Sequence, residues 1–431
     1  MLNLVASWVV WSFLNNFGII RFLNLKTMKN RLTTLLFCLF IGVHVLAQQP
    51  TQWRGENSEA KYPAPKLMAQ WPADGPQVLW HFEELGEGFS SPTFANGKIY
   101  CPGMVDEIGY LSIFNENGSF EKKIPYGKEF EVSYPGSRQT PTIVGDLAYI
   151  VSGYGELICL NLNTGNIVWN KELAKDFGSE HLRWGFNETV VVDGDNVFFT
   201  PGGKEFNMVA LDRMNGSLVW KSAGKGETAA YCTPKLVELP GRKLLVTHTG
   251  KEVIAVDAKD GKMLWSYPHP NQYNIHPNTP IFQDGALFIF SGYGQGCVKL
   301  NLADDGSSVS KVWSTEKMDN QMGGAIISDG FVYTSGHKAR GWFCYDWKTG
   351  EEKWHSTELG NGVVIMAGDK LIAYSDRGEL ALIKPTPEKF DLVSKAKVEY
   401  GTAQHWAHPV VHNGILYVRH GQSLIAYKIS A

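Results

Sequence analysis

The stretch VIAVDAKDGKMLW (Val253–Trp265) decides the fold, because the chain repeats its pattern three more times. The other copies are LICLNLNTGNIVW (Leu157–Trp169), MVALDRMNGSLVW (Met208–Trp220) and WFCYDWKTGEEKW (Trp342–Trp354). Every copy has Asp or Asn in fifth place, Gly in ninth place and Trp at its end. Alternating apolar residues predict a strand, the Asp or Asn and the Gly favour a tight turn, and a second strand ends at Trp. The unit is therefore a predicted β-hairpin.

A second strand–turn–strand pattern occurs eight times, for example TPTIVGDLAYIVSG from Thr140 and TPIFQDGALFIFSG from Thr279. Its Asn-Gly, Asp-Gly and Gly-Asp turns are strong hairpin signals. Two hairpins make four antiparallel strands, and intervals of 41 to 51 residues separate the successive residues Trp169, Trp220, Trp265, Trp313 and Trp354. A four-stranded unit at this period is typical of a β-propeller. We therefore expect an all-β fold of eight four-stranded antiparallel blades.

The two ends of the chain complement each other. The C-terminal segment SLIAYKISA (Ser423–Ala431) matches only the first strand of the hairpin unit. The missing second strand occurs near the start of the chain, where DGPQVLW (Asp74–Trp80) resembles DGKMLW (Asp260–Trp265). We predict that this N-terminal strand completes the eighth blade and closes the ring, which removes the exposed sheet edges of an open array.

The N-terminal region has the features of an export signal. From Met28 onward, two basic residues precede an apolar run that ends at Ala47, which is the pattern of a secretory signal peptide. We interpret residues 28–47 as this signal peptide and residues 1–27 as a gene-model extension. Residues 48–70 are then a lead-in to a single propeller domain, which comprises residues 71–431.

Composition and cysteine placement narrow the class of protein. A formal net charge of −3, 19% charged residues and no run of basic residues argue against nucleic-acid binding. Cys38 lies inside the apolar run rather than at the cleavage point, so we predict no stable membrane anchor. The other five Cys are widely spaced and odd in number, which argues against a disulfide framework. We expect an exported monomer, either periplasmic or secreted.

The Trp-ended units resemble the repeats of pyrroloquinoline-quinone (PQQ) enzymes, the quinoprotein-type propellers. The resemblance covers nearly all of residues 71–431 and implies that the terminal Trp docks each blade onto its neighbour. The residues that it assigns to docking are Trp80, Trp169, Trp220, Trp265, Trp313 and Trp354. The same repeats occur in non-enzymatic propellers, notably the outer-membrane β-barrel assembly lipoprotein. QWRGENS (Gln52–Ser58) and HWAHPVVHNGILYVRHG (His405–Gly421) also resemble exported bacterial PQQ-like propellers.

Loops on one face of the predicted ring are rich in polar and aromatic residues. They lead into the first strand of a blade or join its second and third strands, and in a four-stranded blade these loops share a face. A propeller has a natural funnel there, and loops carry function on rigid scaffolds. The candidate ligand-binding residues on this face are Arg138, His181, Arg183, Trp184, Glu188, His276, Asn278, His405, Trp406 and His408.

Each candidate also has a structural interpretation. His405, Trp406 and His408 precede a predicted innermost strand, where residues often pack against a neighbouring blade. Arg183 and Trp184 could hold an anion against an aromatic face, or they could be part of a packed loop. No tight spacing such as HxH or HExxH occurs among the histidines, so we predict no metal site. The sequence assigns no catalytic residue.

Two functions from different classes remain open. A PQQ-dependent dehydrogenase needs the cofactor, a cation and a carboxylate base, and alcohol-oxidising members of the family typically add adjacent cysteines and Glu, Asn and Asp ligands for calcium. This chain has no Cys-Cys pair, and Asn187-Glu188 is the nearest fragment of a calcium set. We therefore favour a non-catalytic exported propeller without a cofactor, which binds a protein or glycan partner on its funnel face. The alternative is a dehydrogenase that uses PQQ with Ca²⁺ to oxidise an alcohol or a sugar.

Overall fold

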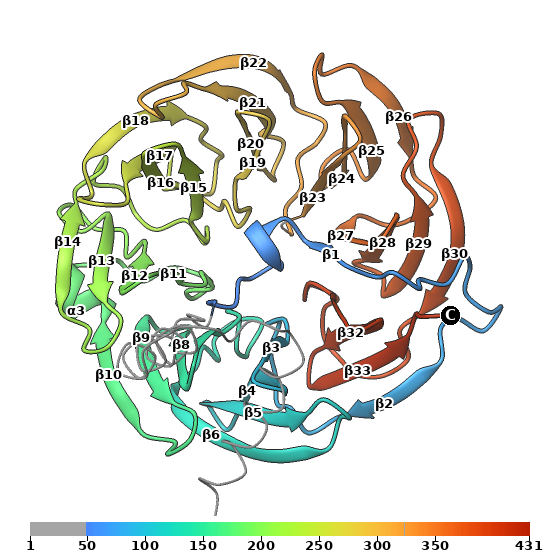
Figure 1. Cartoon of the computed structure of the whole chain (residues 1–431), viewed down its shortest axis with the longest axis horizontal. Coiled ribbons are helices and arrows are strands. Elements are labelled where there is room, and N and C mark those ends of the chain that lie inside the picture. Colours follow the sequence, from blue (N-terminus) through green and yellow to red (C-terminus); the bar gives the residue numbers. More distant parts are fainter. Residues whose placement is uncertain (1–48, 323) are drawn as a thin grey trace, which may run out of the picture. The chain divides into compact units, whose positions relative to one another are not determined.

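The computed structural model describes residues 49–322 and 324–431. The predicted signal peptide and residues 1–27 lie outside this part of the chain. Pro50–Ala431 form one unit, in which eight small sheets are arranged around a central axis (Figure 1). The prediction of an eight-bladed, all-β propeller is confirmed.

Six of the blades follow each other along the chain as simple antiparallel meanders. Blade 1 comprises β3 (Thr93–Ala95), β4 (Lys98–Val105), β5 (Ile108–Asn115) and β6 (Phe120–Lys128). Blade 2 comprises β7 (Thr142–Val144), β8 (Leu147–Val151), β9 (Glu156–Asn161) and β10 (Ile167–Glu172). Blade 3 comprises β11 (Val191–Asp193), β12 (Asn196–Phe199), β13 (Met208–Asp212) and β14 (Leu218–Ser222). Blade 4 comprises β15 (Lys235–Leu239), β16 (Arg242–His248), β17 (Glu252–Asp257) and β18 (Met263–Pro268). Blade 5 comprises β19 (Ile281–Gln283), β20 (Ala286–Ser291), β21 (Gly296–Leu302) and β22 (Val309–Thr315). Blade 6 comprises β23 (Ala325–Ser328), β24 (Phe331–Gly336), β25 (Gly341–Asp346) and β26 (Glu352–Ser356).

The last two blades contain strands from the N-terminal region. Blade 7 comprises β27 (Gly362–Ala367), β28 (Lys370–Ser375), β29 (Glu379–Lys384) and β30 (Asp391–Lys397), with β1 (Lys61–Tyr62) added beside β27. Blade 8 comprises β31 (Val410–His412), β32 (Ile415–His420), β33 (Ser423–Lys428) and β2 (Val78–Phe82). The antiparallel pairing of β2 with β33 confirms the predicted closure of the ring.

The repeated hairpin has a simple packing logic. The terminal Trp of a unit lies opposite the third residue of the same unit, as in the pairs Trp169–Cys159, Trp220–Ala210, Trp265–Ala255 and Trp354–Cys344. These third residues are small, so they leave room for the indole on the same face of the blade. Cys159 and Cys344 are both free and buried, which agrees with their role as small apolar residues.

The indoles of Trp169, Trp220 and Trp354 also contact the turn of the following blade. Trp220 Nε1 donates a hydrogen bond to Ala258 O at 3.0 Å. Gly261 in that turn has a φ of +73°, and a Cβ there would lie 2.4 Å from the Trp220 ring. The same arrangement joins Trp169 to Arg213 and Gly216, and Trp313 to Trp347 and Gly350. The ninth-place Gly therefore supplies both a left-handed turn residue and the space for the preceding blade's Trp.

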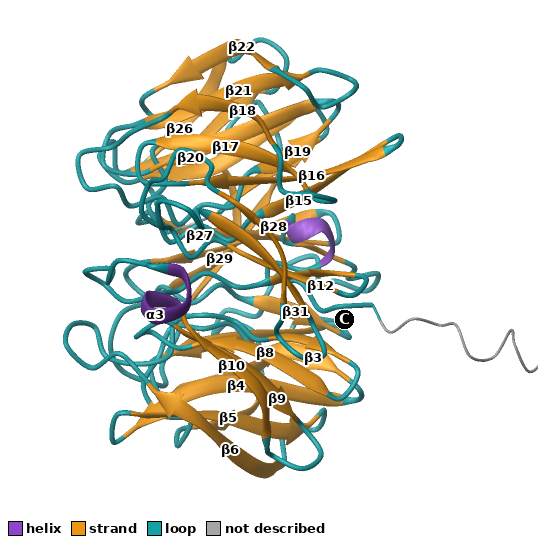
Figure 2. Ribbon diagram, turned by 90° about the vertical axis from the view of Figure 1, so that its left-hand side faces the viewer, coloured by secondary structure: helices purple, strands orange, loops and turns teal. Residues whose placement is uncertain are grey.

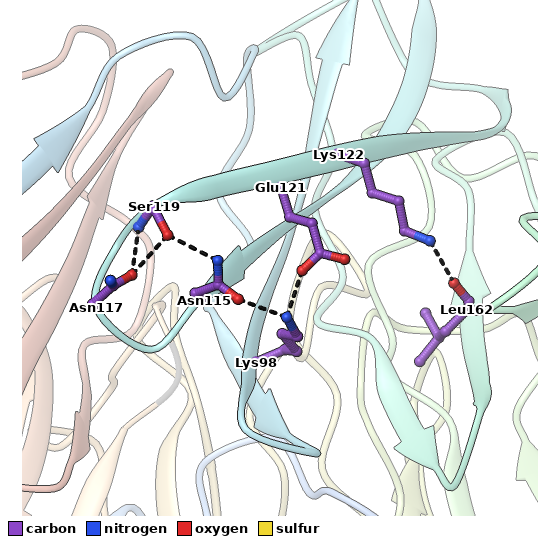
Figure 3. Close-up of polar contacts among 7 residues, drawn as sticks. All are labelled: Lys98, Asn115, Asn117, Ser119, Glu121, Lys122 and Leu162. Atoms are coloured by element: carbon purple, nitrogen blue, oxygen red, sulfur yellow. Dashed lines mark hydrogen bonds and ion pairs between the residues drawn. The ribbon is translucent and has the colours of Figure 1, made fainter.

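Blade 1 lacks this Trp, and a lysine supplies the hydrogen bond instead (Figure 3). Lys122 occupies the place opposite Ile113, the third residue of its unit. Its Nζ donates to Leu162 O of blade 2 at 3.0 Å. Leu162 directly follows the fifth-place Asn161, just as Ala258 follows Asp257. Blade 1 therefore keeps a hydrogen-bond donor to the turn carbonyl of the next blade, although it lacks the indole ring.

The lead-in occupies the ring axis. The short helix η1 (Glu56–Ser58) lies at the centre of the ring in Figure 1. Arg54 is buried there and donates to Ala325 O at 3.1 Å, and Lys235 of blade 4 donates to Asn57 O. In the side view, η1 and the helix α3 (Leu173–Phe177) lie toward opposite faces of the ring (Figure 2). No helix within residues 49–322 and 324–431 is long and apolar enough to span a membrane.

Candidate functional site

A hollow of about 340 Å³, which we call the aromatic funnel, lies on the face formed by the loops that lead into the blades. Its aromatic lining residues are Trp53, Phe89, Tyr134, Trp184, Tyr231, Tyr293 and Trp406. The rings of Phe89 and Trp406 lie 5.2 Å apart, and those of Trp406 and Tyr134 lie 4.8 Å apart. Trp184 follows at 6.0 Å from Tyr134. These rings form a continuous arc contributed by four neighbouring leading loops, those of blades 8, 1, 2 and 3.

Hydroxyl groups at the starts of the first strands line the deeper part of the aromatic funnel. Ser91, Thr140, Thr189 and Thr233 stand at equivalent positions in blades 1 to 4, and all of them except Thr189 are followed by Pro. The Ser91 N–H donates to Thr140 Oγ1 at 3.0 Å, and the Thr189 N–H donates to Thr233 Oγ1 at 2.9 Å. Each blade start is thereby tied to the next. These hydrogen bonds make the four hydroxyl groups a rigid floor of the aromatic funnel.

Trp53, Arg54 and His408 connect the lead-in to the base of the aromatic funnel. Arg54 Nη1 donates to His408 Nδ1 at 2.9 Å, while His408 Nε2 donates to Met322 O at 2.8 Å. The ring of Trp53 lies 4.9 Å from that of His408. Burial and the neighbouring Arg54 lower the pKa of His408 to about 3, so its imidazole is neutral and accepts the Arg54 hydrogen bond.

Arg138 stiffens the aromatic arc from behind. Its Nη2 donates to the carbonyl oxygens of Ser133 and Tyr134, both at 2.6 Å. The guanidinium also lies 5.0 Å from the centre of the Phe130 ring. Burial lowers the pKa of Arg138 to about 10, which leaves it charged at neutral pH. It holds the Tyr134 loop and contributes one positive charge to the wall of the aromatic funnel.

A second hollow of about 690 Å³ adjoins the aromatic funnel, and we call it the basic mouth. The two hollows share Trp184, Tyr231, Ile275 and Tyr293 as lining residues. The further lining of the basic mouth comprises Arg183, Gln272, Tyr273, His337, Lys338 and Arg340. The guanidinium of Arg183 lies over the Trp184 ring at 4.8 Å. The shared wall makes the two hollows one continuous surface for a ligand.

The structure distributes the ten predicted site residues among three environments. Arg138, Trp184, Trp406 and His408 line the aromatic funnel, and Arg183 and Trp184 line the basic mouth. His181 is exposed, and the half-buried His405 stacks on His420 at 3.8 Å, so neither lines these two hollows.

The remaining three predicted residues, Glu188, His276 and Asn278, are buried behind the wall. Glu188 accepts the N–H of Tyr231 at 2.9 Å and that of Asn187 at 3.2 Å. Burial raises its pKa to about 7. Asn278 donates to Phe290 O at 3.0 Å and to Asn320 O at 2.7 Å. These contacts hold the loops whose outer residues form the hollows.

Several lining residues lie outside the predicted set. Phe89 and Tyr231 precede the first strands of blades 1 and 4, so the rule that selected Trp184 and Trp406 would also have found them. Trp53 belongs to the lead-in, and no local pattern indicates that this segment crosses the axis. Its contribution arises only from the tertiary fold.

Three histidines gather beside the hollows although their sequence spacing predicts no metal site. A ring nitrogen of each of His248, His269 and His276 lies within 4.8 Å of the others, and all three side chains are buried. The rings of His248 and His276 are stacked with an interplanar angle of 12°. An ion cannot lie in the planes of two parallel rings, so joint coordination would require one ring to turn. His276 is already held by Ser291 Oγ at 2.8 Å and Gly250 O at 3.1 Å.

Comparison with known proteins places this geometry in context. The family model of the outer membrane protein assembly factor BamB matches residues 77–356. The chain is 23% identical over 208 residues to BamB of Shewanella oneidensis, which covers 46% of this chain and 48% of that protein. It is 27% identical over 157 residues to the quinoprotein ethanol dehydrogenase of Pseudomonas aeruginosa, covering 36% of this chain and 22% of that protein. The chain spans about half the length of the curated BamB proteins that it matches.

Solved structures of both functional classes share the fold. BamB from Moraxella catarrhalis superimposes with a TM-score of 0.60 at 16% identity, covering 82% of this chain and 99% of that chain. A europium-containing methanol dehydrogenase superimposes with a TM-score of 0.58 at 12% identity, covering 80% of this chain and 85% of that chain. These similarities establish the fold and leave the function to be argued from the hollows.

Proposed function

Since the chain belongs to the PQQ-like propeller family of the outer membrane protein assembly factor BamB, we propose that it is an exported, non-catalytic binding protein. Its partner is a protein or glycan that is held in the aromatic funnel. The observation that carries this proposal is the lining itself, which combines broad ring faces with hydroxyl and amide groups on a rigid floor. Flat aromatic surfaces with a few fixed polar groups are typical of binding sites.

The residues present do not fit PQQ with Ca²⁺. Calcium binds six to eight oxygen ligands, usually with several carboxylates among them. No Asp or Glu belongs to the described lining of either hollow. Glu188, the acidic residue of the Asn187-Glu188 fragment, is fully buried and its oxygens accept backbone N–H groups. A carboxylate base for alcohol oxidation is also lacking in this lining, so we derive no step through the cofactor.

A binding experiment on the purified full chain tests the proposal. Glycan and peptide arrays are probed with the wild-type protein, with Trp184→Ala/Trp406→Ala and with Leu218→Ala/Val219→Ala. The last two substitutions lie on the outer strand β14, where Leu218 and Val219 are 47% and 50% exposed. We expect the funnel variant to lose its array signals and the outer variant to keep them. Equal retention by both variants would place the partner elsewhere on the ring.

A thermal-shift titration with PQQ and Ca²⁺, alone and together, tests the alternative function. We expect no saturable stabilisation. A ligand that binds only the folded state at 100 times its dissociation constant stabilises the protein by about 2.7 kcal/mol, which is readily detected. A saturable shift that needs both components, followed by dye-linked oxidation of an alcohol or sugar, would replace the binding function with a dehydrogenase.

A further inference from the structure

The charges around the two hollows are segregated. Arg138 lines the aromatic funnel, and Arg183, Lys338 and Arg340 line the basic mouth, whereas none of the described lining residues is acidic. The whole chain nevertheless has a net charge of −3. Its negative charges therefore lie away from this surface. A concave surface lined by one sign of charge attracts ligands of the opposite sign.

The three cations of the basic mouth are available to a ligand. Arg183, Lys338 and Arg340 are exposed, and within the described residues none of them forms a salt bridge. Asp319 lies beneath the Lys338 loop, but it is buried and accepts the backbone N–H groups of Lys338 and Gly294. Asp376 interacts electrostatically with Arg340 without lining the mouth. The loop is thus held by backbone contacts, and its cationic side chains remain in solvent.

The apolar part of the lining consists mostly of ring faces. Trp184, Tyr231 and Tyr293 belong to both hollows, and Tyr273 packs edge-on against Tyr293 at 4.8 Å. The aliphatic and proline side chains of this lining are Ile275, Pro277 and Met322. Flat ring faces match the flat C–H face of a pyranose, whereas a peptide is usually anchored by side chains inserted into separate pockets. The lining therefore favours sugar rings over a peptide.

Polar groups between the aromatic rings can form hydrogen bonds with the hydroxyl groups of a sugar. Gln321 Nε2 donates to the Tyr293 hydroxyl at 2.7 Å; Gln321 lines the aromatic funnel, and Tyr293 lines both hollows. Asn187 lines the aromatic funnel, and its buried Oδ1 has no hydrogen-bond partner within residues 49–322 and 324–431. Sugar hydroxyl groups can donate to such an oxygen and accept from such an amide.

We propose that the basic mouth and the aromatic funnel bind a segment of an acidic polysaccharide. Its carboxylate or sulfate groups contact Arg183, Lys338 and Arg340, and its sugar rings stack on Trp184 and the neighbouring aromatic rings. This inference rests on the proposed binding function and specifies the class of its ligand. Arginine beside an aromatic ring is suited to this task, because its planar guanidinium pairs with two anionic oxygens while it stacks.

The experiment uses affinity electrophoresis of the purified full chain in gels that contain one polysaccharide each. Polygalacturonate provides carboxylates, chondroitin sulfate adds sulfates, and dextran is the neutral comparison. The test variant is Arg183→Gln/Lys338→Gln/Arg340→Gln. The matched control is Lys259→Gln/Lys348→Gln/Lys384→Gln, which removes the same number of positive charges from exposed positions outside both hollows. Poly-glutamate, measured by biolayer interferometry, represents an acidic peptide.

We expect the wild-type protein to bind at least one acidic polysaccharide and to pass dextran without retardation. The test variant should bind at least tenfold more weakly, and the control variant should bind like wild type. Wild-type binding should weaken with added salt, because exposed charge pairs are screened. Preference between polygalacturonate and chondroitin sulfate identifies the anionic group.

Other results overturn the inference in distinguishable ways. Equal binding of dextran, or an unchanged test variant, would show that charge does not select the ligand. Tighter binding of poly-glutamate through the same three cations would identify an acidic peptide instead. If Trp184→Ala/Trp406→Ala abolishes array binding while no acidic polysaccharide binds, the proposed function stands and the ligand class is wrong. If neither the array nor the gels give a signal that depends on these residues, both proposals fail.

Discussion

Two seams between neighbouring blades solve the same problem with different side chains. Between blades 3 and 4, Trp220 donates to Ala258 O at the outer edge of the ring. Between blades 1 and 2, Lys122 donates to the equivalent Leu162 O (Figure 3). Both bonds satisfy a carbonyl in the turn of the following blade. The indole additionally buries a large apolar surface, whereas the lysine is only half-buried.

Both seams also contain a buried carboxyl group that accepts a backbone N–H, and we call these hydrogen bonds the inner contacts. Glu188 accepts the N–H of Tyr231 across the seam of blades 3 and 4, and Glu129 accepts the N–H of Gly153 across the seam of blades 1 and 2. Both carboxyl groups are buried, and burial raises the pKa of each to about 7. Hydrogen bonds therefore join the blades at both seams, and the seam of blades 3 and 4 adds the burial of an indole ring.

The largest loss of stability is expected when a substitution removes both the buried indole and its hydrogen bond. Trp220→Ala deletes a buried indole and its hydrogen bond, and we expect it to lower the free energy of unfolding by about 3–5 kcal/mol. Urea denaturation followed by circular dichroism measures this loss. A decrease below about 1 kcal/mol would show that the seam does not depend on the Trp.

The inner contacts contain carboxyl groups that titrate, so the pH dependence of stability distinguishes them from the hydrogen bonds of Trp220 and Lys122 at the outer edge. A carboxyl group whose pKa is about 7 in the folded state and about 4.5 when unfolded stabilises the fold fully below pH 4.5, and this contribution is lost as the pH rises to 7. The amide of Glu188→Gln or Glu129→Gln does not titrate, so these variants do not lose this contribution. Their free energy of unfolding should therefore increase relative to that of the wild type as the pH rises from 4.5 to 7. The change is on the order of 3 kcal/mol for each variant, from about 1.4 kcal/mol per pKa unit.

Urea denaturation at several pH values between 4.5 and 7.5 provides this measurement. Glu388→Gln, at an exposed position, is the control. The two inner variants should change with the same sign, since both seams bury a carboxyl group. A difference from wild type that is constant with pH would contradict the assignment of these two groups.

The turn glycines test whether the indole needs its space. Gly261 and Gly165 have φ values of +73° and +75°, so alanine at either position costs about 1–2 kcal/mol in backbone strain. A Cβ at Gly261 would lie 2.4 Å from the Trp220 ring, while one at Gly165 would lie 3.5 Å from Ile124. We expect Gly261→Ala to cost about 1–3 kcal/mol more than Gly165→Ala. Equal thermal stabilities of the two variants would remove this steric argument.

A smaller effect isolates the hydrogen bond of the indole. Trp220 and Trp265 are 8% and 7% exposed, but Trp265 Nε1 has no hydrogen-bond partner among the residues that the structure describes. Trp220→Phe and Trp265→Phe remove similar apolar volume, and only the first leaves a carbonyl without its donor. Trp220→Phe should therefore cost about 1 kcal/mol more than Trp265→Phe in urea denaturation. The reverse order would mean that ring packing outweighs the bond.

The smallest effect is expected at the lysine seam. Lys122→Met keeps most of the side-chain length and removes the donor to Leu162 O. We expect a loss of about 0.5–1 kcal/mol, since the group is half-buried and water can replace the ammonium. Lys123→Met, at the adjacent exposed position, is the control. Identical stabilities of these two variants would show that the Lys122 bond contributes nothing.

Features that depend on neighbouring residues could be predicted from the sequence, whereas features that depend on contacts between distant segments could not. The turn glycine and the terminal Trp recur at fixed places, so the sequence predicts the hairpin, its period and the closing pair of β2 and β33. Lys122 shows no such pattern. Its role depends on the register opposite Ile113 and on a carbonyl that is supplied by the next blade.

The candidate site divides in the same way. A loop rule selected Arg138, Arg183, Trp184, Trp406 and His408, which line the two hollows. The same rule also selected Glu188, whose carboxyl group turns inward to bind backbone N–H groups. Topology determines the face on which a loop lies, but only packing determines whether a side chain points into the hollow or behind its wall.

The sequence by itself determined the repeating architecture, because turn geometry, alternation and the Trp-ended unit act over a few residues and recur around the ring. The tertiary structure alone decided what occupies the axis and what lines the hollows. The lead-in brings Trp53 and Arg54 beside His408, a contact that spans 354 residues between Arg54 and His408. Contacts at such separation have no period and form only when the closed ring brings the segments together.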